Sequence, residues 1–215
     1  MTLIKQYKTL IILIFGIILV LIPYLLFLQT PQYEEFKMWS QQNVILLCFI
    51  LIAIKITGII FPPIPGGLII LGMVPIIGWF GAYLLDLTGT LIGSSVAFFL
   101  GKKYGNKLLI KLFDKIMVER IYDIKIKKNR EIESVFVLRF LFGSTLTEII
   151  CYAAGILKIS YKNFVIGSIA SHFFISLPAY YFANNLILGK NLWINGIIVL
   201  IAFPILWKVR GRYLE

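Results

Sequence analysis

Cysteine, histidine and acidic residues are all scarce in this chain of 215 residues. The two cysteines, Cys48 and Cys151, lie far apart in apolar sequence, which is typical of small buried side chains and excludes a disulfide framework. The single histidine, His172, has no Cys/His cluster around it, so the usual metal-ligand spacings are absent. Neither a P-loop nor a nucleophile–base set is visible. We therefore expect no cofactor, no bound metal and no enzymatic activity.

Hydrophobic residues make up 60% of the chain, whereas a soluble domain contains about half. The formal net charge of +11 could indicate a nucleic-acid partner, but this hydropathy argues against one. In a membrane protein, Lys and Arg mark cytoplasmic loops and contact anionic lipid headgroups. We predict an all-α integral membrane protein with a single domain and no nucleic-acid partner.

Four apolar stretches are predicted to be complete spans, since each approaches the roughly 20 residues that a helix needs to cross a bilayer. They are residues 10–28, 78–100, 161–188 and 191–207. The first is too long for the apolar core of a signal peptide, and we expect it to stay as a span. Residues 29–42 are polar, and there we expect a short interfacial helix on the outer side.

A cluster of proline and glycine interrupts the apolar sequence of the first half. The break contains Pro62, Pro63, Pro65, Gly66 and Gly67. The prolines remove backbone donors and block helical geometry, while the glycines permit a sharp reversal. In lipid, freed backbone groups survive only where protein or a water-filled cavity shields them. We predict a re-entrant hairpin within residues 44–77, with two complete crossings as the alternative.

Residues 102–130 are strongly basic, with ten Lys/Arg against three acids. Lysines recur every four residues from Lys103 to Lys115, and apolar side chains fall on the opposite face. This pattern predicts a basic amphipathic helix on the cytoplasmic membrane surface. A specific anionic-lipid site on it is left open.

A second interrupted stretch, broken at Gly143, begins the segment 134–188, which we expect to hold a hairpin followed by a span. The basic residues that follow the break decide its topology: Lys158, Lys162, Lys208, Arg210 and Arg212. A complete crossing would place all of them outside, whereas a re-entrant hairpin keeps them inside. The positive-inside bias favours the hairpin. We expect both termini to lie in the cytoplasm and the protein to reside in the cell (plasma) membrane.

The two halves, residues 44–101 and 134–188, then share one order of elements: each follows a surface helix and consists of a broken apolar hairpin and a full span. They enter the membrane from opposite faces, as inverted-topology repeats do. We predict about four spans and two opposed re-entrant hairpins that meet near the midplane and form a transport site.

Several short motifs in this order resemble the DedA family, also called the VTT-domain or SNARE-associated Golgi protein superfamily. They are the Phe61–Gly67 break, the glycine-rich span that ends at Gly101–Gly105, the Leu138-Arg139-Phe140 triplet and the Glu148–Gly155 segment. The similarity covers roughly residues 44–185. In this chain residues 142–145 replace the proline that the family usually places after Arg-Phe, and Lys55 is the nearest ionisable group before the first break.

The resemblance implies an ATP-independent flippase or scramblase for an anionic lipid or a polyprenyl phosphate. Membrane lipids are then the expected partners, while protons and a second copy of the chain are left open as further partners.

Two ionisable residues in the second hairpin are the strongest candidates for substrate binding. Arg139 lies in apolar sequence, where a charge costs about 2.5–3.5 kcal/mol on insertion scales, so it must pair, snorkel or face a wet cavity. It could hold a lipid phosphate by a fork-shaped contact, or form a structural ion pair with Glu148 across the turn. Glu148 could release the phosphate or carry a proton. Thr145 is a further candidate for substrate binding, although Thr145 and Glu148 also fit a capping box.

The remaining candidates complete the predicted site. Gly66 and Gly67 begin the return arm of the first hairpin, where a helix N-terminus suits an anion, and Tyr152 follows Glu148 as a further substrate contact. Lys55, Asp86 and His172 are candidates for a proton or charge relay, although a packing histidine and a snorkelling lysine are the simpler interpretations. Two alternatives to lipid transport stay open: a proton-coupled carrier of a small solute, and a non-transporting protein that organises the membrane.

Overall fold

The computed structural model describes residues 26–61, 64–113, 118, 126–142 and 147–187. Every regular element in these ranges is a helix, which confirms the all-α prediction. The predicted last span, nearly all of the predicted first span, and Pro62, Pro63, Gly143 and Thr145 lie outside the described residues. The chain divides into two compact units, Met1–Leu47 and Cys48–Glu215.

Helix α2 (Pro31–Gln42) is the main element in the described part of the first unit. It begins where the sequence favours a start, because the Thr30 side chain accepts a hydrogen bond from the Tyr33 backbone N–H and Pro31 occupies the first turn. This confirms the helix predicted within residues 29–42.

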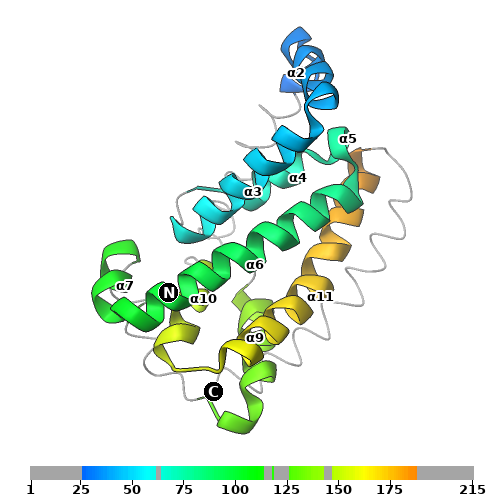
Figure 1. Ribbon diagram of the computed structural model, residues 1–215. Helices are drawn as coiled ribbons and strands as arrows, with labels where there is room; N and C mark the ends of the chain where they lie inside the picture. The colour runs from blue at the N-terminus through cyan, green and yellow to red at the C-terminus, as the bar shows by residue number, and fades with distance from the viewer. Residues whose placement is uncertain (1–25, 62–63, 114–117, 119–125, 143–146, 188–215) are drawn as a thin grey trace, which may run out of the picture. The chain divides into compact units, whose positions relative to one another are not determined.

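Helix α3 begins at Val44 in the first unit and continues into the second unit, which contains seven further described α-helices. Their bounds are α3 Val44–Ile60, α4 Gly66–Gly72, α5 Val74–Ile77, α6 Trp79–Tyr104, α7 Asn106–Leu112, α9 Glu131–Phe142, α10 Thr147–Ile156 and α11 Tyr161–Ile187, with a 3-10 turn at Lys128–Arg130. Of these, α6 and α11 are long and apolar enough to span a membrane, and a bent pair of α2 and α3 would add a third span. α6 and α11 lie side by side and run in opposite directions (Figure 1).

The first break folds α4 back onto α3. A Cβ atom at Gly58 would lie 2.7 Å from the Ile64 carbonyl oxygen, and one at Gly66 would lie 3.0 Å from the Lys55 Cα atom. Only glycine permits so close an approach of two backbones. α4 has 7 residues and α5 has 4, far from the roughly 20 that a complete crossing requires. The two elements therefore form a helical hairpin with α3.

α9 and α10 form the second hairpin, with 12 and 10 residues. The Arg139 guanidinium on α9 donates a 3.6 Å hydrogen bond to Cys151 Sγ on α10, which joins the two arms. The spacing matches the first half, since α3 ends at residue 60 before a long helix that begins at 79, and α9 ends at residue 142 before one that begins at 161.

Small residues on α6 bring the two hairpins close to this central helix. Gly89 faces the Lys55 side chain and Gly93 faces Ile56 and Ile59, both on α3. Gly101 meets the Tyr152 backbone on α10, so the second hairpin also packs closely against α6.

The basic segment differs from the single surface helix predicted for residues 102–130. α6 continues to Tyr104, and α7 ends after Leu112 because Phe113 has an extended backbone, with φ −133° and ψ 159°. In α7, Leu109 is buried and Lys111 is exposed, so the described helical part is short and two-sided.

Tyr152 lies on the second hairpin and stabilises the backbone where the first break begins. Its side chain is fully buried, and its hydroxyl donates a 3.0 Å hydrogen bond to the carbonyl oxygen of Ile60, the last residue of α3. The proline-containing segment that follows supplies few N–H donors, so this carbonyl needs a side-chain partner.

We expect Tyr152→Phe to lower the stability of the protein by about 0.5–1.5 kcal/mol, because the hydrogen bond to the half-buried Ile60 carbonyl would be lost. Thermal unfolding in detergent measures this change. Tyr161→Phe is the matched control: the Tyr161 hydroxyl contacts Ser95 at 2.9 Å in an exposed position, where water can replace it. Equal losses in the two variants would contradict the assigned role of Tyr152.

Candidate functional site

A cavity of about 500 Å³ lies between both hairpins and the two long helices. Pro65, Gly66 and Gly67 line it from the first hairpin, and Arg139 and Glu148 line it from the second. The remaining polar lining comes from Lys55, Asp86, Thr90, Ser171, His172, Ser176 and Tyr180. The five ionisable residues singled out in the sequence thus surround one cavity, although they belong to five different helices.

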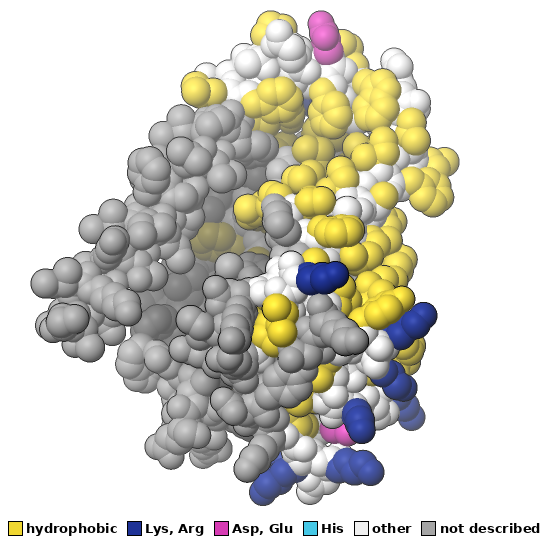
Figure 2. Space-filling view, turned by 90° about the vertical axis from the view of Figure 1, so that its left-hand side faces the viewer, with side chains coloured by type: hydrophobic (Ala, Val, Ile, Leu, Met, Phe, Trp, Pro, Cys, Tyr) yellow, Lys and Arg dark blue, Asp and Glu magenta, His cyan; other side chains and the backbone are white. Residues whose placement is uncertain are grey.

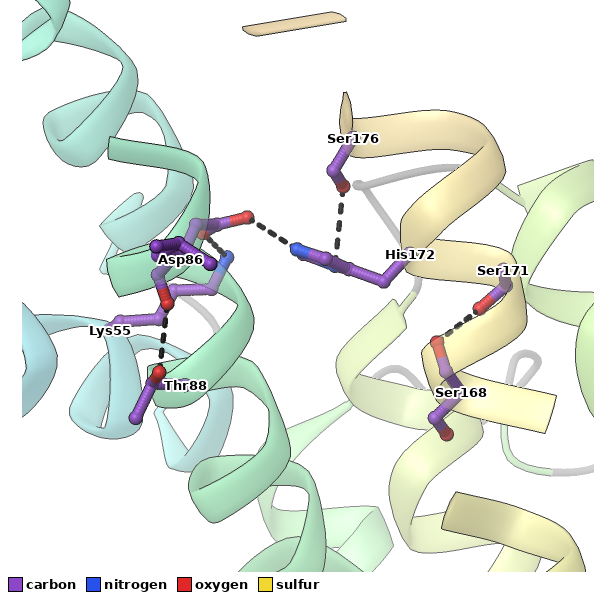
Figure 3. Close-up of polar contacts among 8 residues, drawn as sticks. Lys55, Asp86, Thr88, Ser168, Ser171, His172 and Ser176 are labelled. Carbon is purple, nitrogen blue, oxygen red and sulfur yellow. Dashed lines mark hydrogen bonds and ion pairs between the residues drawn. The ribbon is translucent and has the colours of Figure 1, made fainter. Parts of the chain in front are cut away.

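Asp86 is the centre of a buried charge cluster (Figure 3). Its Oδ1 atom lies 2.6 Å from Lys55 Nζ, and its Oδ2 atom lies 3.3 Å from His172 Nε2. The Asp86 side chain is only 5% exposed and that of Lys55 is 15% exposed. Because a lone buried charge is expensive, the cluster allows both ions to remain inside an apolar helix bundle.

His172 is held from three sides, by Asp86, Ser176 and Tyr83. Ser176 Oγ lies 3.2 Å from its Nδ1 atom, one turn further along α11, and the Tyr83 ring stacks on the imidazole with centroids 5.6 Å apart. The Tyr180 hydroxyl also interacts with the Asp86 carboxylate. These contacts fix the imidazole between α6 and α11, so His172 connects the two halves of the protein.

Arg139 is 4% exposed, and no carboxylate in the described chain forms an ion pair with it. Its Nη1 atom donates to Ser168 Oγ at 2.9 Å and to Cys151 Sγ at 3.6 Å, and both acceptors are neutral. A guanidinium has five N–H donors, so this cation keeps hydrogen-bonding capacity on the side that lines the cavity.

Glu148 does not form the direct ion pair with Arg139 that the hairpin prediction left open. It is half-buried near the start of α10, lines the cavity, and interacts electrostatically with both Lys55 and Arg139. The carboxylate therefore faces two cations across the cavity without neutralising either one by contact.

The remaining predicted residues fall into two groups. Gly66 and Gly67 line the cavity, and a Cβ atom at Gly67 would lie 3.2 Å from Lys55 Nζ. Tyr152 is not among the lining residues and its hydroxyl bonds the Ile60 carbonyl oxygen, so its contact with a substrate stays a prediction. Gly143 and Thr145 lie outside the described residues.

Thr90, Ser168 and Tyr180 were missed in the sequence. The Thr90 hydroxyl is buried, lines the cavity and has no hydrogen-bond partner. A usable signal was the spacing of four residues between Asp86 and Thr90 and between Ser168 and His172, which places each pair on one helix face. Within the described ranges, no group of three or more His, Cys, Asp or Glu could hold a metal ion.

Two long apolar helices, two shorter broken hairpins and a charged cavity between them define an integral membrane protein of the polytopic α-helical class. The model of the VTT domain matches residues 61–185, more than half of the chain, and the protein belongs to this family. It is also 28% identical over 128 residues to an uncharacterized protein of Methanocaldococcus jannaschii, a match that covers 55% of this chain and 75% of that protein. No solved structure matches the chain.

Proposed function

We propose that this protein moves an anionic lipid, or a polyprenyl phosphate, between membrane leaflets without ATP. The headgroup would pass through the cavity between the two hairpins, while the hydrocarbon chains of the substrate stay in the bilayer. The observation that carries the proposal is Arg139, a buried cation that lines the cavity and has only neutral hydrogen-bond acceptors. A guanidinium matches a phosphate through two parallel hydrogen bonds.

The lengths of the hairpin arms support a re-entrant path. None of α4, α9 and α10 reaches the roughly 20 residues of a spanning helix, so each would end inside the hydrocarbon core or return to its own side. Broken backbone at that depth is tolerated where it lines a cavity, and Pro65 and Gly66 do so.

Surface charge supports a cytoplasmic position for one end of the second unit. Exposed Lys and Arg occur at the end of α6, in α7, and around the starts of α9 and α11: Lys102, Lys103, Lys111, Lys127, Lys128, Arg130, Lys158 and Lys162. Figure 2 shows Lys and Arg side chains gathered at the lower end of the face in view. By the positive-inside rule this end faces the cytoplasm, where it would attract anionic lipids toward the entrance.

In the proposed cycle, Arg139 binds the phosphate. The half-buried carboxylate of Glu148 competes with the phosphate for Arg139. The competition keeps the headgroup from being held too tightly, which a site for passage requires. The Thr90 hydroxyl would add a neutral donor to the path.

Reconstitution in vesicles that carry a labelled phosphatidylglycerol tests the proposal. We expect leaflet exchange that requires the protein and proceeds without nucleotide. Exchange at the same rate in protein-free vesicles would refute the proposal.

A proton-coupled carrier of a small solute is the second candidate, because Asp86 and His172 form a buried contact that can accept a proton. A transport rate that follows an imposed pH gradient, with no lipid exchange, would favour this function over the first.

A further inference from the structure

The two halves of the protein place a polar residue at the same point of their long helices. Asp86 is the eighth residue of α6, and Ser168 is the eighth residue of α11. Four residues further along, Thr90 and His172 are both buried and both line the cavity. The separation between the first hairpin arm and the long helix is also the same in both halves: α3 ends at residue 60 and α6 begins at 79, while α9 ends at 142 and α11 begins at 161. Asp86 and Ser168 are therefore equivalent positions of the two repeats.

The side chain at each of these positions contacts the cationic residue of the hairpin in its own half. Lys55 on α3 contacts Asp86 at 2.6 Å, and Arg139 on α9 donates to Ser168 at 2.9 Å. The two contacts have the same place in each half, but Asp86 carries a negative charge and Ser168 is neutral. Asp86 neutralises Lys55, whereas the serine hydroxyl leaves the charge of Arg139 uncompensated by contact.

We propose that Asp86 makes the cavity selective for a headgroup with one phosphate group over a headgroup with a diphosphate, an inference that rests on the proposed function. The first phosphate binds Arg139. A second phosphate in the same cavity needs a second available cation, but Lys55 is already paired. The second phosphate also meets the carboxylates of Asp86 and Glu148, and like charges in a buried site disfavour that ligand strongly.

The test compares farnesyl phosphate and farnesyl diphosphate as probes that share one chain and differ by one phosphate group. Binding to the purified full-length protein in detergent is measured by titration calorimetry. We expect the wild type to prefer the monophosphate. Asp86→Asn keeps the side-chain shape, removes the negative charge and frees Lys55, so the affinity for the diphosphate should rise about tenfold relative to the monophosphate.

Two further variants make this gain specific. In Lys55→Gln/Asp86→Asn the freed cation is removed, and the gain for the diphosphate should disappear. Thr88→Val is the matched control on α6, because Thr88 bonds only its own helix, through the Leu84 carbonyl oxygen at 2.8 Å, and does not line the cavity (Figure 3). It should leave the ratio of the two affinities unchanged. A gain of affinity cannot arise from misfolding, so the result is readable even if the variants are less stable.

The outcomes separate this inference from the proposed function. A wild type that binds neither probe refutes the phosphate site itself, and with it both proposals. A wild type that binds the monophosphate, together with an Asp86→Asn ratio equal to that of the wild type, refutes the role of Asp86 alone. Inorganic phosphate and pyrophosphate serve as chain-free probes: weaker binding than the farnesyl compounds supports a lipid substrate, and equal binding contradicts it.

Discussion

Replacing Arg139 with glutamine is expected to reduce lipid exchange in reconstituted vesicles on the order of a hundredfold, close to the rate without protein. The change removes the cation that is proposed to hold the phosphate, and the loss of one partner of a buried charged contact costs about 2–5 kcal/mol. Arg139→Lys should recover only part of the activity, because an ammonium keeps the charge but lacks the planar fork that matches a phosphate.

Controls must separate this loss from damage to the fold, since Arg139 also joins α9 to α10 and α11. Ser168→Ala removes the strongest structural hydrogen bond of Arg139 but keeps the cation, so most of the exchange activity should remain. Lys111→Gln and Lys128→Gln each remove one of the eight exposed Lys and Arg charges described at the basic end and do not touch the cavity lining, so each should reduce exchange far less than Arg139→Gln. Full exchange activity in Arg139→Gln would contradict the proposed role of Arg139.

Bulky side chains at Gly101 or Gly155 are expected to prevent the protein from folding, the largest effect on stability that we predict. A Cβ atom at Gly101 would collide with the Tyr152 carbonyl oxygen, and one at Gly155 would collide with the Phe98 carbonyl oxygen. Both collisions are with backbone, which cannot move without separating α6 from α10. Gly101→Leu should therefore cost more than about 4 kcal/mol, at the upper limit of single substitutions.

The measurement is the yield and thermal stability of the monodisperse protein in detergent. Gly81→Ala is the matched control on the same helix, since the nearest atom to its added Cβ would be Ile77 Cβ at an ordinary 4.0 Å. It should be neutral or slightly stabilising, because alanine favours the helical backbone. A stable, monodisperse Gly101→Leu protein would show that α6 and α10 do not pack as described.

The cavity residues could be predicted from the sequence because charge in apolar sequence is costly and therefore informative. Lys55, Asp86, Arg139, Glu148 and His172 were all identified in this way, and all line one cavity. The glycine spacing of α6 is typical of close helix packing in lipid, and Gly89 and Gly93 do meet α3.

The pairing of these residues could not be predicted, because it depends on how helices are rotated against one another. Arg139 contacts Ser168, 29 residues away, and Tyr152 contacts Ile60, 92 residues away, and no local pattern encodes either contact. The basic segment was misjudged for another reason. Its lysine spacing is helical from Lys103 to Lys115, but periodicity does not show where a helix ends, and Phe113 adopts an extended backbone.

The distance between the two breaks tests the central claim, that both hairpins reach one cavity. Spin labels can be placed at Ile64→Cys, in the first break, and at Glu148→Cys, near the second, with Cys48 replaced by serine and the fully buried Cys151 left in place. Pulsed electron paramagnetic resonance in lipid should give a single distance well below the roughly 30 Å thickness of the hydrocarbon core. A distance at or beyond that thickness would place the breaks at opposite membrane surfaces and contradict the account.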